Sequence, residues 1–270
     1  MLLLFLVAAL AAPLIAPQNP YDLRKVSLEH FLKPPVWHPG GQAPFLLGTD
    51  DRGRDILSTM LYGCRTSLLV GFGVVSLAAT VGVTLGLLAR YYGGRLDAVI
   101  MRLAATLFSF STTLIAFLML GLFKQRGVLI VILAIAVVDW VRYARTMRGS
   151  VLEVKEEAYI AAARATGCRD TRLLLNHLLP NAMAPILVIM AVDLAVVIMI
   201  EATLSFLGVG VPLTEPSLGM MISIGKNYIY AGMWWMVVFP GGAVVLLVVG
   251  INVFADWLRE ELNPRIGRRR

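Results

Sequence analysis

The sequence predicts an all-α membrane protein with six membrane-spanning helices. The 270-residue chain is 58% hydrophobic, whereas a soluble globular chain is roughly 45–50% apolar. The apolar residues fall into six blocks, separated by segments that are polar or rich in Pro and Gly. A helical span of a bilayer takes about 20 mainly apolar residues, and these blocks approach or exceed that length.

The first block, residues 1–16, is the shortest. At 1.5 Å per residue it would rise about 24 Å. A signal peptide is the alternative, because "AALAAP" offers small residues near a cleavage point, but no basic segment precedes the apolar run. We expect residues 1–17 to form a first transmembrane helix whose cytoplasmic lead-in is missing from this chain.

Residues 18–66 are polar and rich in Pro and Gly, which predicts an extracytoplasmic loop. The end of this loop, "RDILSTMLYGCR", places its apolar residues on one helical face. That pattern predicts a helix lying in the membrane interface before the second span. The preceding "DDRGRD" is interpreted as a structural turn that caps this helix, since Arg52 occupies a position where a calcium loop needs a ligand.

Residues 67–258 form the core domain and hold the other five spans. The second span contains Gly82 and Gly86, a spacing that permits close contact between helices. Residues 259–270 form a basic tail. The five spans are expected at 67–89, at 97–122, from 128 onwards, at 182–207 and at 234–257.

The distribution of basic residues predicts the orientation of the spans. Fifteen of the 24 Lys and Arg residues lie on the side that holds the turn at 90–95, the polar segment before the fifth span and the tail. Lys and Arg near span ends accumulate on the cytoplasmic side. Both termini are therefore expected in the cytoplasm, and the net charge of +7 is interpreted as a topology signal rather than as nucleic-acid binding.

The polar cytoplasmic segment, about 153–180, has the pattern of two short helices. The first, 157–166, ends at Gly167, which can take the left-handed conformation that closes a helix. Asp170 can then cap the second helix. The segment is therefore expected to be a rigid angled structure rather than a simple connection.

The prolines and alanines of this segment support the same interpretation. Pro180 and Pro185 are expected to break or redirect the chain into the fifth span. Ala161, Ala162 and Ala163 would give the first helix a small-residue surface. Such a surface suits insertion into a groove of another protein.

Several ordered motifs carry a resemblance to a known family. "AAARATG", followed at the family spacing by "LP", resembles the EAA loop of bacterial ABC importer permeases. The flanking "LLGTDDRGRDILS", "GCRTSLLVG", "WVRYARTMRGSVL", "LLPN", "EATLSFLGVG", "AGMWWMVVFPG" and "LREELNPR" are similar to the dipeptide/oligopeptide (and nickel) permease family, in its second-subunit type. The resemblance covers residues 45–265, most of the chain.

This resemblance implies the architecture of the complex. In the family, two homologous permeases form the pathway, two cytoplasmic ATPases drive it, and an extracytoplasmic binding protein delivers the solute. The chain would be a six-span ABC importer transmembrane domain whose EAA loop docks on an ATPase. The family glutamate falls at Ala161 here, and Glu157, one turn earlier, is its candidate replacement. The coupling positions in this sequence are Glu157, Ala161, Ala162, Ala163, Gly167 and Pro180.

The implied function is to form half of the path for dipeptides or oligopeptides in the bacterial inner membrane. ATP and Mg²⁺ would bind to the partner ATPases, with no cofactor or metal on this chain, since "GMMISIGKN" at 219–227 departs from the phosphate-loop pattern. The alternatives are import of nickel chelates or another small solute by the same architecture, an ion-driven secondary carrier, and a structural membrane anchor.

Acidic residues within the spans are the remaining candidates, because a carboxylate in a membrane usually faces a polar path or a partner. Asp193 and Glu201 lie eight residues apart in the fifth span and can point toward one broad face. They are hypothesised to face the pathway or the partner permease, and helix-to-helix hydrogen bonding is the alternative. Asp139 lies one turn from Arg142, which predicts a structural ion pair.

Overall fold

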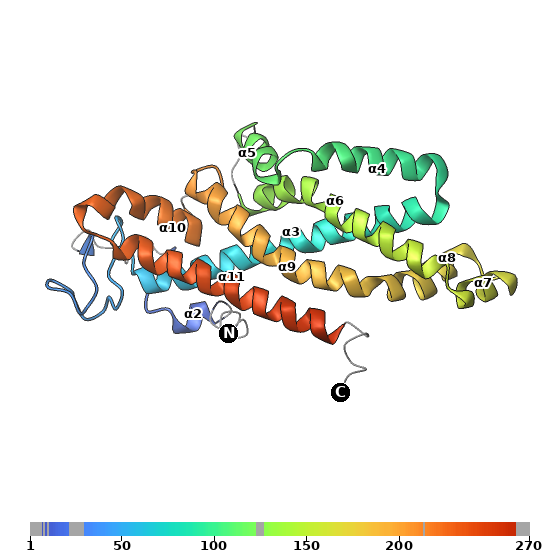
Figure 1. The fold of residues 1–270 in the computed structure, drawn as a ribbon. Helices are drawn as coiled ribbons and strands as arrows, with labels where there is room; N and C mark the ends of the chain where they lie inside the picture. The colour runs from blue at the N-terminus through green and yellow to red at the C-terminus, as the bar shows by residue number, and fades with distance from the viewer. Residues whose placement is uncertain are drawn as a thin grey trace.

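In the computed structural model the described chain is an elongated bundle of helices (Figure 1). The structure describes residues 7, 9, 11–21, 30–122, 127–212 and 214–262. Among these, the only β pairing is a single bridge between Thr49 and Asp55. The helices are α2 (Ala12–Ile15), α3 (Ile56–Tyr92), α4 (Gly94–Phe108), α5 (Thr112–Leu122), α6 (Val128–Lys155), α7 (Ala158–Ala165), α8 (Asp170–Arg172), η2 (Leu173–Leu178), α9 (Leu179–Phe206), α10 (Leu218–Gly225), η3 (Lys226–Ala231) and α11 (Trp235–Glu261).

Up to four segments of the described chain are long and apolar enough to cross a membrane. They are α3, the helical run Asp170–Phe206, α11, and α4 with α5 taken together. The helix α6 has 28 residues but carries Asp139, Arg142 and Arg145 in its middle turns. Residues 1–6, 8 and 10 of the first predicted span lie outside the described residues, and the described part contains the four-residue helix α2.

The expected interfacial helix is not a separate element. Residues 56–65 and the second span form one 37-residue helix, α3. Its first turns are held by the protein itself, since Ile56, Tyr62 and Cys64 are buried. These residues are therefore continuous with the second span and packed on the bundle, and their location in the membrane interface stays a prediction.

The third predicted span, 97–122, is broken. Its two parts, α4 and α5, meet at 86° across residues 109–111. The hydroxyl of Ser109 donates to the carbonyl of Ala105 at 3.0 Å, and the amide of Phe110 bonds three residues back to Leu107. Such a bond from a serine hydroxyl slightly destabilises a helix and often bends it.

The pair α3 and α6 forms the centre of the bundle, and α9 packs against both. A Cβ atom added at Gly82 would overlap the carbonyl of Trp140, and one at Gly86 would overlap the carbonyl of Ala144. The two glycines thus allow the α3 and α6 backbones to touch, as their spacing predicts.

The two ends of the bundle differ. The turn between α3 and α4 lies at the same end as α7 and α8, whereas α10 and the 30–55 loop lie at the other (Figure 1). At the loop end, Asp55 caps α3 by accepting from the amide of Ser58 at 2.8 Å, and Asp50 pairs with Arg54 at 2.7 Å. The "DDRGRD" segment is therefore the structural turn that was predicted.

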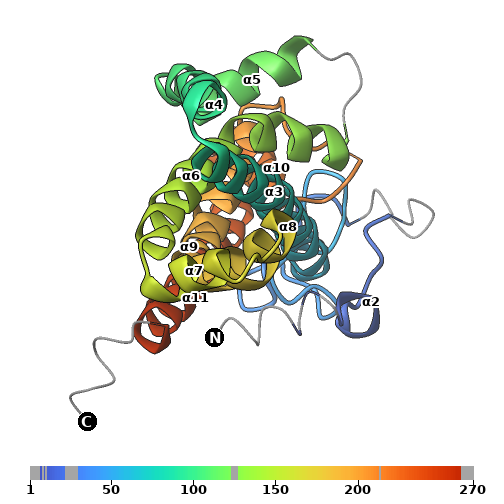
Figure 2. The same cartoon turned by 90° about the vertical axis from the view of Figure 1, so that its right-hand side faces the viewer.

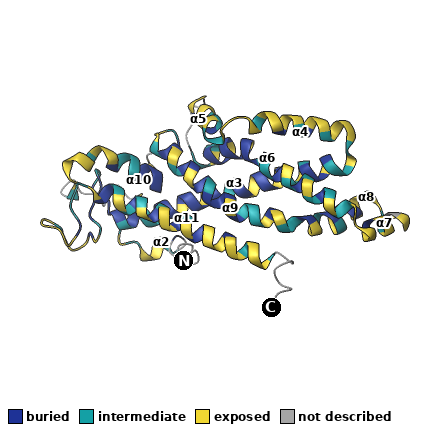
Figure 3. Ribbon diagram, in the orientation of Figure 1, coloured by how far each residue is buried: buried dark blue, intermediate teal, exposed yellow. Residues whose placement is uncertain are grey.

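Large apolar side chains remain exposed along the outer helices (Figure 3). On α4, Leu103 is 58% exposed, and on α11, Val253 is 62% exposed. An apolar surface this extensive on the long axis of a bundle is expected to meet lipid or another membrane subunit.

Candidate functional site

The segment between α6 and α9 forms a separate projection at one end of the bundle. It consists of α7, a turn at Gly167, and the helical run α8–η2 that leads directly into α9. Figure 2 looks onto this end, with α7 and α8 in front of the bundle. The projection is the part of the described chain that the sequence predicted to dock on a partner.

A single large residue anchors α7. Ile160 is fully buried and belongs to the same hydrophobic cluster as Leu173 and Leu178 of η2. The adjoining Ala161 and Ala162 are exposed, and Ala163 is half-buried. The helix is therefore fixed on one side and presents small side chains on the other, which matches the predicted docking surface.

Glu157 lies immediately before α7 and is exposed. Its carbonyl accepts from the amides of Ile160 at 3.0 Å and Ala161 at 3.4 Å, which makes it the N-terminal cap residue by position. A carboxylate at this end interacts favourably with the helix dipole. Glu157 is therefore placed to offer a negative charge at the edge of the alanine surface.

The turn at Gly167 has the backbone conformation that the sequence predicts. Gly167 has φ of +77°, and the amide of Cys168 bonds to the carbonyl of Ala163 at 3.1 Å. This six-to-one bond closes the end of α7 in the manner of a Schellman motif. No atom lies within 4 Å of a Cβ atom added at this position, so the requirement for glycine comes from the backbone angle alone.

Asp170 does not cap the second helix. It is the first residue of α8, whose cap residue is Arg169, and no side-chain cap is formed. The Asp170 carboxylate instead accepts a hydrogen bond from the hydroxyl of Tyr91 at the end of α3. The backbone carbonyl of Tyr91 also accepts from Lys155 Nζ at 3.2 Å, at the end of α6. Tyr91 therefore ties the projection to two bundle helices.

The two prolines do not break the chain. The helix α9 begins at Leu179, with Pro180 in its first turn, and continues through Pro185. Because α8, η2 and α9 form one helical run, Pro180 lies in its interior and removes one backbone hydrogen bond there. The preceding six residues form a π-helix, a wider turn that is common near functional sites. The prediction of a break was wrong, and the projection is rigidly continuous with the fifth span.

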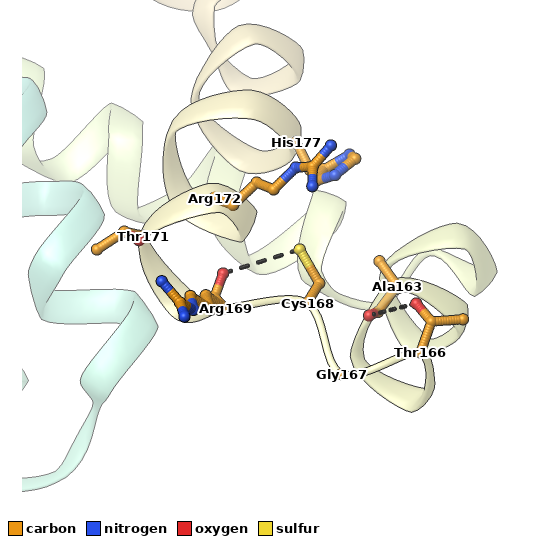
Figure 4. A pocket seen from close by; sticks show the side chains of 8 residues that line it. All are labelled: Ala163, Thr166, Gly167, Cys168, Arg169, Thr171, Arg172 and His177. Atoms are coloured by element: carbon orange, nitrogen blue, oxygen red, sulfur yellow. Dashed lines mark hydrogen bonds between the residues drawn. The ribbon is translucent and has the colours of Figure 1, made fainter.

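A basic hollow of about 710 Å³ lies beside the Gly167 turn (Figure 4). Arg169 and Arg172 give it a cationic lining, and Figure 4 shows Arg172 and His177 projecting in the same direction. Sequence reasoning used these residues only as topology or helix residues. The sequence signal that could have indicated the hollow is the group of basic residues that follows Gly167 within ten positions. The other lining residues are Ala163, Thr166, Gly167, Cys168 and Thr171.

Asp193 lies inside the subunit and is 2% exposed. Its carboxylate accepts from Arg142 Nη1 at 2.6 Å and from the hydroxyl of Tyr143 at 2.7 Å. Arg142 also approaches Asp139 at 3.6 Å, which confirms the predicted ion pair within α6. Asp139, Arg142 and Tyr143 of α6 and Asp193 of α9 thus form a polar cluster that links the two helices.

Glu201 is completely buried near the other end of α9. It accepts from the hydroxyls of Ser67 on α3 and Ser205, each at 2.8 Å. Neither Asp193 nor Glu201 lies on an exposed face of the chain. Both therefore make the helix-to-helix bonds of the alternative interpretation, and their role along a pathway stays a prediction.

Two further predictions concern metal ions and the phosphate-loop pattern at 219–227. They contain no group of three or more His, Cys, Asp and Glu side chains that could hold a metal ion. Within the described region, residues 219–227 are helical and belong to α10 and η3 rather than to a phosphate-binding loop.

Comparison with known proteins gives consistent similarities. Residues 82–268 match the family described as binding-protein-dependent transport system inner membrane component. The chain is 36% identical over 265 residues to the dipeptide transport system permease protein DppC of Haemophilus influenzae, covering 98% of this chain and 88% of that protein. It is 34% identical over 267 residues to the oligopeptide transport system permease protein OppC of Bacillus subtilis, covering 98% and 83%.

The fold is also similar to solved structures. A chain of the MetNI methionine ABC transporter, from a study of its inward-facing conformations, superposes with a TM-score of 0.64. The match covers 77% of this chain and 98% of that chain at 18% identity. At this identity the likeness concerns the fold alone.

Proposed function

The chain belongs to the binding-protein-dependent transport system inner membrane component family, and we propose that it forms half of the translocation pathway of an ATP-driven importer of dipeptides or oligopeptides. The permeases that it resembles over nearly their whole length carry the names of dipeptide, di/tripeptide and oligopeptide systems. These names favour peptides over nickel chelates as the solute.

The observation that carries this proposal is the rigid coupling projection. The alanine surface of α7 is free to enter a groove, while Ile160 and the Gly167 turn hold its angle. Two cytoplasmic ATPases would supply such grooves, one for this chain and one for a homologous permease. ATP and Mg²⁺ would bind to the ATPases, and this subunit would not hydrolyse ATP by itself.

The connections of the projection support a coupling mechanism. The helical run from Asp170 to Phe206 is continuous, so a displacement of α7 would be carried along the whole fifth span. The contacts of Tyr91 would carry the same displacement to α3 and α6. Closure of the ATPases would thereby move the bundle helices between inward-open and outward-open arrangements, which is a rigid-body switch of the kind seen in transporters.

The proposed orientation follows from the same mechanism. The end that carries α7 and α8 would face the cytoplasm together with both termini, and α10 and the 30–55 loop would face outward toward a solute-binding protein. The acidic and basic residues of the "DDRGRD" turn give this outer loop a fixed shape. A fixed surface is what docking of a binding protein requires.

The proposal is tested by solute uptake in cells with and without this chain. Deletion is expected to abolish energy-dependent uptake of labelled dialanine, and the intact chain is expected to restore it. Uptake of nickel in the same cells should not change. Loss of nickel uptake with dialanine uptake intact would favour the nickel-chelate alternative and reject the peptide proposal.

A further inference from the structure

A small hollow lies beside the broken third span, away from the coupling projection. It has a volume of about 230 Å³ and opens between the break at 109–111 and the middle of α6. From Asp139, α6 extends about 16 Å to its first residue and about 24 Å to its last at 1.5 Å per residue. The hollow therefore lies beside the middle of α6, far from both of its ends. The lining residues are Phe108, Phe110, Ser111, Thr112, Val138, Asp139, Val141 and Arg142.

The carboxylate of Asp139 lies at the inner wall of this hollow. Its side chain is 1% exposed, and neither of its oxygens has a hydrogen-bond partner among the described residues. The one opposite charge near it is the guanidinium of Arg142, at 3.6 Å. A buried carboxylate without hydrogen bonds is costly and usually marks a site that receives a partner.

Arg142 does not satisfy Asp139, because its closer partner is Asp193. Arg142 Nη1 donates to Asp193 at 2.6 Å, and Tyr143 completes the bonding of the second Asp193 oxygen at 2.7 Å. Two carboxylates therefore share one guanidinium. With both ionised, Asp139, Asp193 and Arg142 together carry one negative charge, and Asp139 is the carboxylate that lines the hollow.

The shape and chemistry of the hollow select the missing partner. A primary ammonium has three donors and no acceptor, which suits the free oxygens of Asp139 and the hydroxyls of Ser111 and Thr112. The ring of Phe110 is 55% exposed at the same break, and aromatic faces attract cations. The guanidinium of Arg145 already lies over Phe108, 4.4 Å from the ring centre.

We propose that this hollow is a solute subsite that receives the α-ammonium group of a peptide during its passage, with Asp139 as the direct contact and Asp193 and Arg142 as positioning residues. The inference rests on the proposed function, since it requires that peptides are the solute. Arg142 at 3.6 Å weakens the field of Asp139, which limits the affinity. A pathway site must release its solute as readily as it binds it.

The test measures the charge preference of the hollow directly. The full complex carries Ser111→Cys, Cys64→Ala and Cys168→Ser in this chain, and labelling of this chain is followed with a cationic and an anionic methanethiosulfonate of similar size. Each rate is divided by the rate of the same reagent with a free thiol in solution, because a thiolate by itself favours the cationic reagent. The corrected rate at position 111 is expected to be about tenfold or more higher for the cationic reagent, because the charge of Asp139 concentrates cations.

Two further variants assign this preference to Asp139. Asp139→Asn should reduce the ratio of the two corrected rates to near one, and Asp139→Glu should restore most of it. Glu260→Gln, which removes one exposed acidic charge on α11, is the matched control and should leave the ratio unchanged. An unchanged ratio in Asp139→Asn would overturn the inference. If Asp139→Asn fails to assemble, the parent alone decides, and the absence of a cation preference in the parent would overturn the inference.

A second measurement separates this inference from the proposed function. Dialanine supplied with binding protein and ATP should slow cationic labelling in the parent complex, and N-acetyl-dialanine should not. Wild-type uptake of dialanine without any protection would reject the subsite but keep the proposed function. Absence of dialanine uptake by the wild-type complex would reject the proposed function itself.

Discussion

Replacing Gly167 with valine should uncouple the subunit from its ATPases while leaving it assembled in the membrane. Gly167 has φ of +77°, and the amide of the next residue, Cys168, donates a hydrogen bond to the carbonyl of Ala163 that closes the end of α7. No atom lies within 4 Å of the added Cβ, so the substitution meets no neighbouring group. Its whole effect comes from the backbone angle.

The size of that effect follows from the left-handed conformation. An L-residue in this region is destabilised by roughly 1–3 kcal/mol, and β-branched residues are the least tolerant. A cost of one or two kcal/mol changes a population ratio by a factor of about 5–30. We therefore expect α7 to leave its native angle more often by about that factor, which would lower peptide-dependent ATP hydrolysis several-fold.

The assay is ATP hydrolysis and dialanine uptake by the purified complex, with subunit yield measured in parallel. Gly149→Val is the matched control, because Gly149 is also exposed and also has open space around it, but lies in α6 without a positive φ. Gly167→Asn should retain most activity, since Asn tolerates the left-handed region. Normal coupling by Gly167→Val at normal yield would refute the claim that this turn sets the angle of α7.

Four further predictions follow from the packing. Gly82→Val should prevent assembly, because the side chain would enter the α6 backbone; near-normal yield in detergent would contradict the close contact. Glu201→Leu should lower the melting temperature of the complex more than Glu201→Gln, since it leaves two buried hydroxyls without an acceptor at about 1–3 kcal/mol each; equal melting temperatures would argue against these bonds. Tyr91→Phe should weaken coupling a few-fold at unchanged yield, measured as dialanine-stimulated ATP hydrolysis, and no change would exclude Tyr91 as a link. Impermeant maleimide should reach Cys168 only from the cytoplasmic side and Tyr230→Cys, on the fully exposed Tyr230, only from outside; the reverse would overturn the orientation.

Much of this fold could be predicted from local sequence. The glycine pair Gly82 and Gly86 indicated a close helix contact, and the structure places both against the α6 backbone. Gly167 indicated a left-handed turn, which the structure contains. The turn at Gly167 depends on neighbouring residues alone, and the spacing of Gly82 and Gly86 indicates a close helix contact without indicating which helix is the partner.

The errors concern features that depend on distant parts of the chain. The amphipathic start of α3 was expected to be a separate helix before the second span, but it is continuous with that span and packs on the bundle. Pro180 and Pro185 indicated a break, but the π-helical turn before them lets the helix continue. Asp170 was expected to cap its own helix, whereas its actual partner, Tyr91, lies 79 residues away in sequence.

The polar cluster shows the same limit. Sequence spacing indicated the pair of Asp139 with Arg142, which the structure confirms at 3.6 Å. It could not indicate that Asp193, from another helix, takes the guanidinium at 2.6 Å and leaves the Asp139 carboxylate without a hydrogen bond. Only the packing of α6 against α9 reveals that competition.

The most direct test of the central claim is accumulation of labelled dialanine in proteoliposomes that contain this chain, its homologous permease, both ATPases and the binding protein. The account predicts uptake that requires ATP and Mg²⁺ on the ATPase side, that is lost when this chain is omitted, and that is insensitive to collapse of ion gradients. Uptake driven by an ion gradient without ATP, or uptake that persists without this chain, would contradict it.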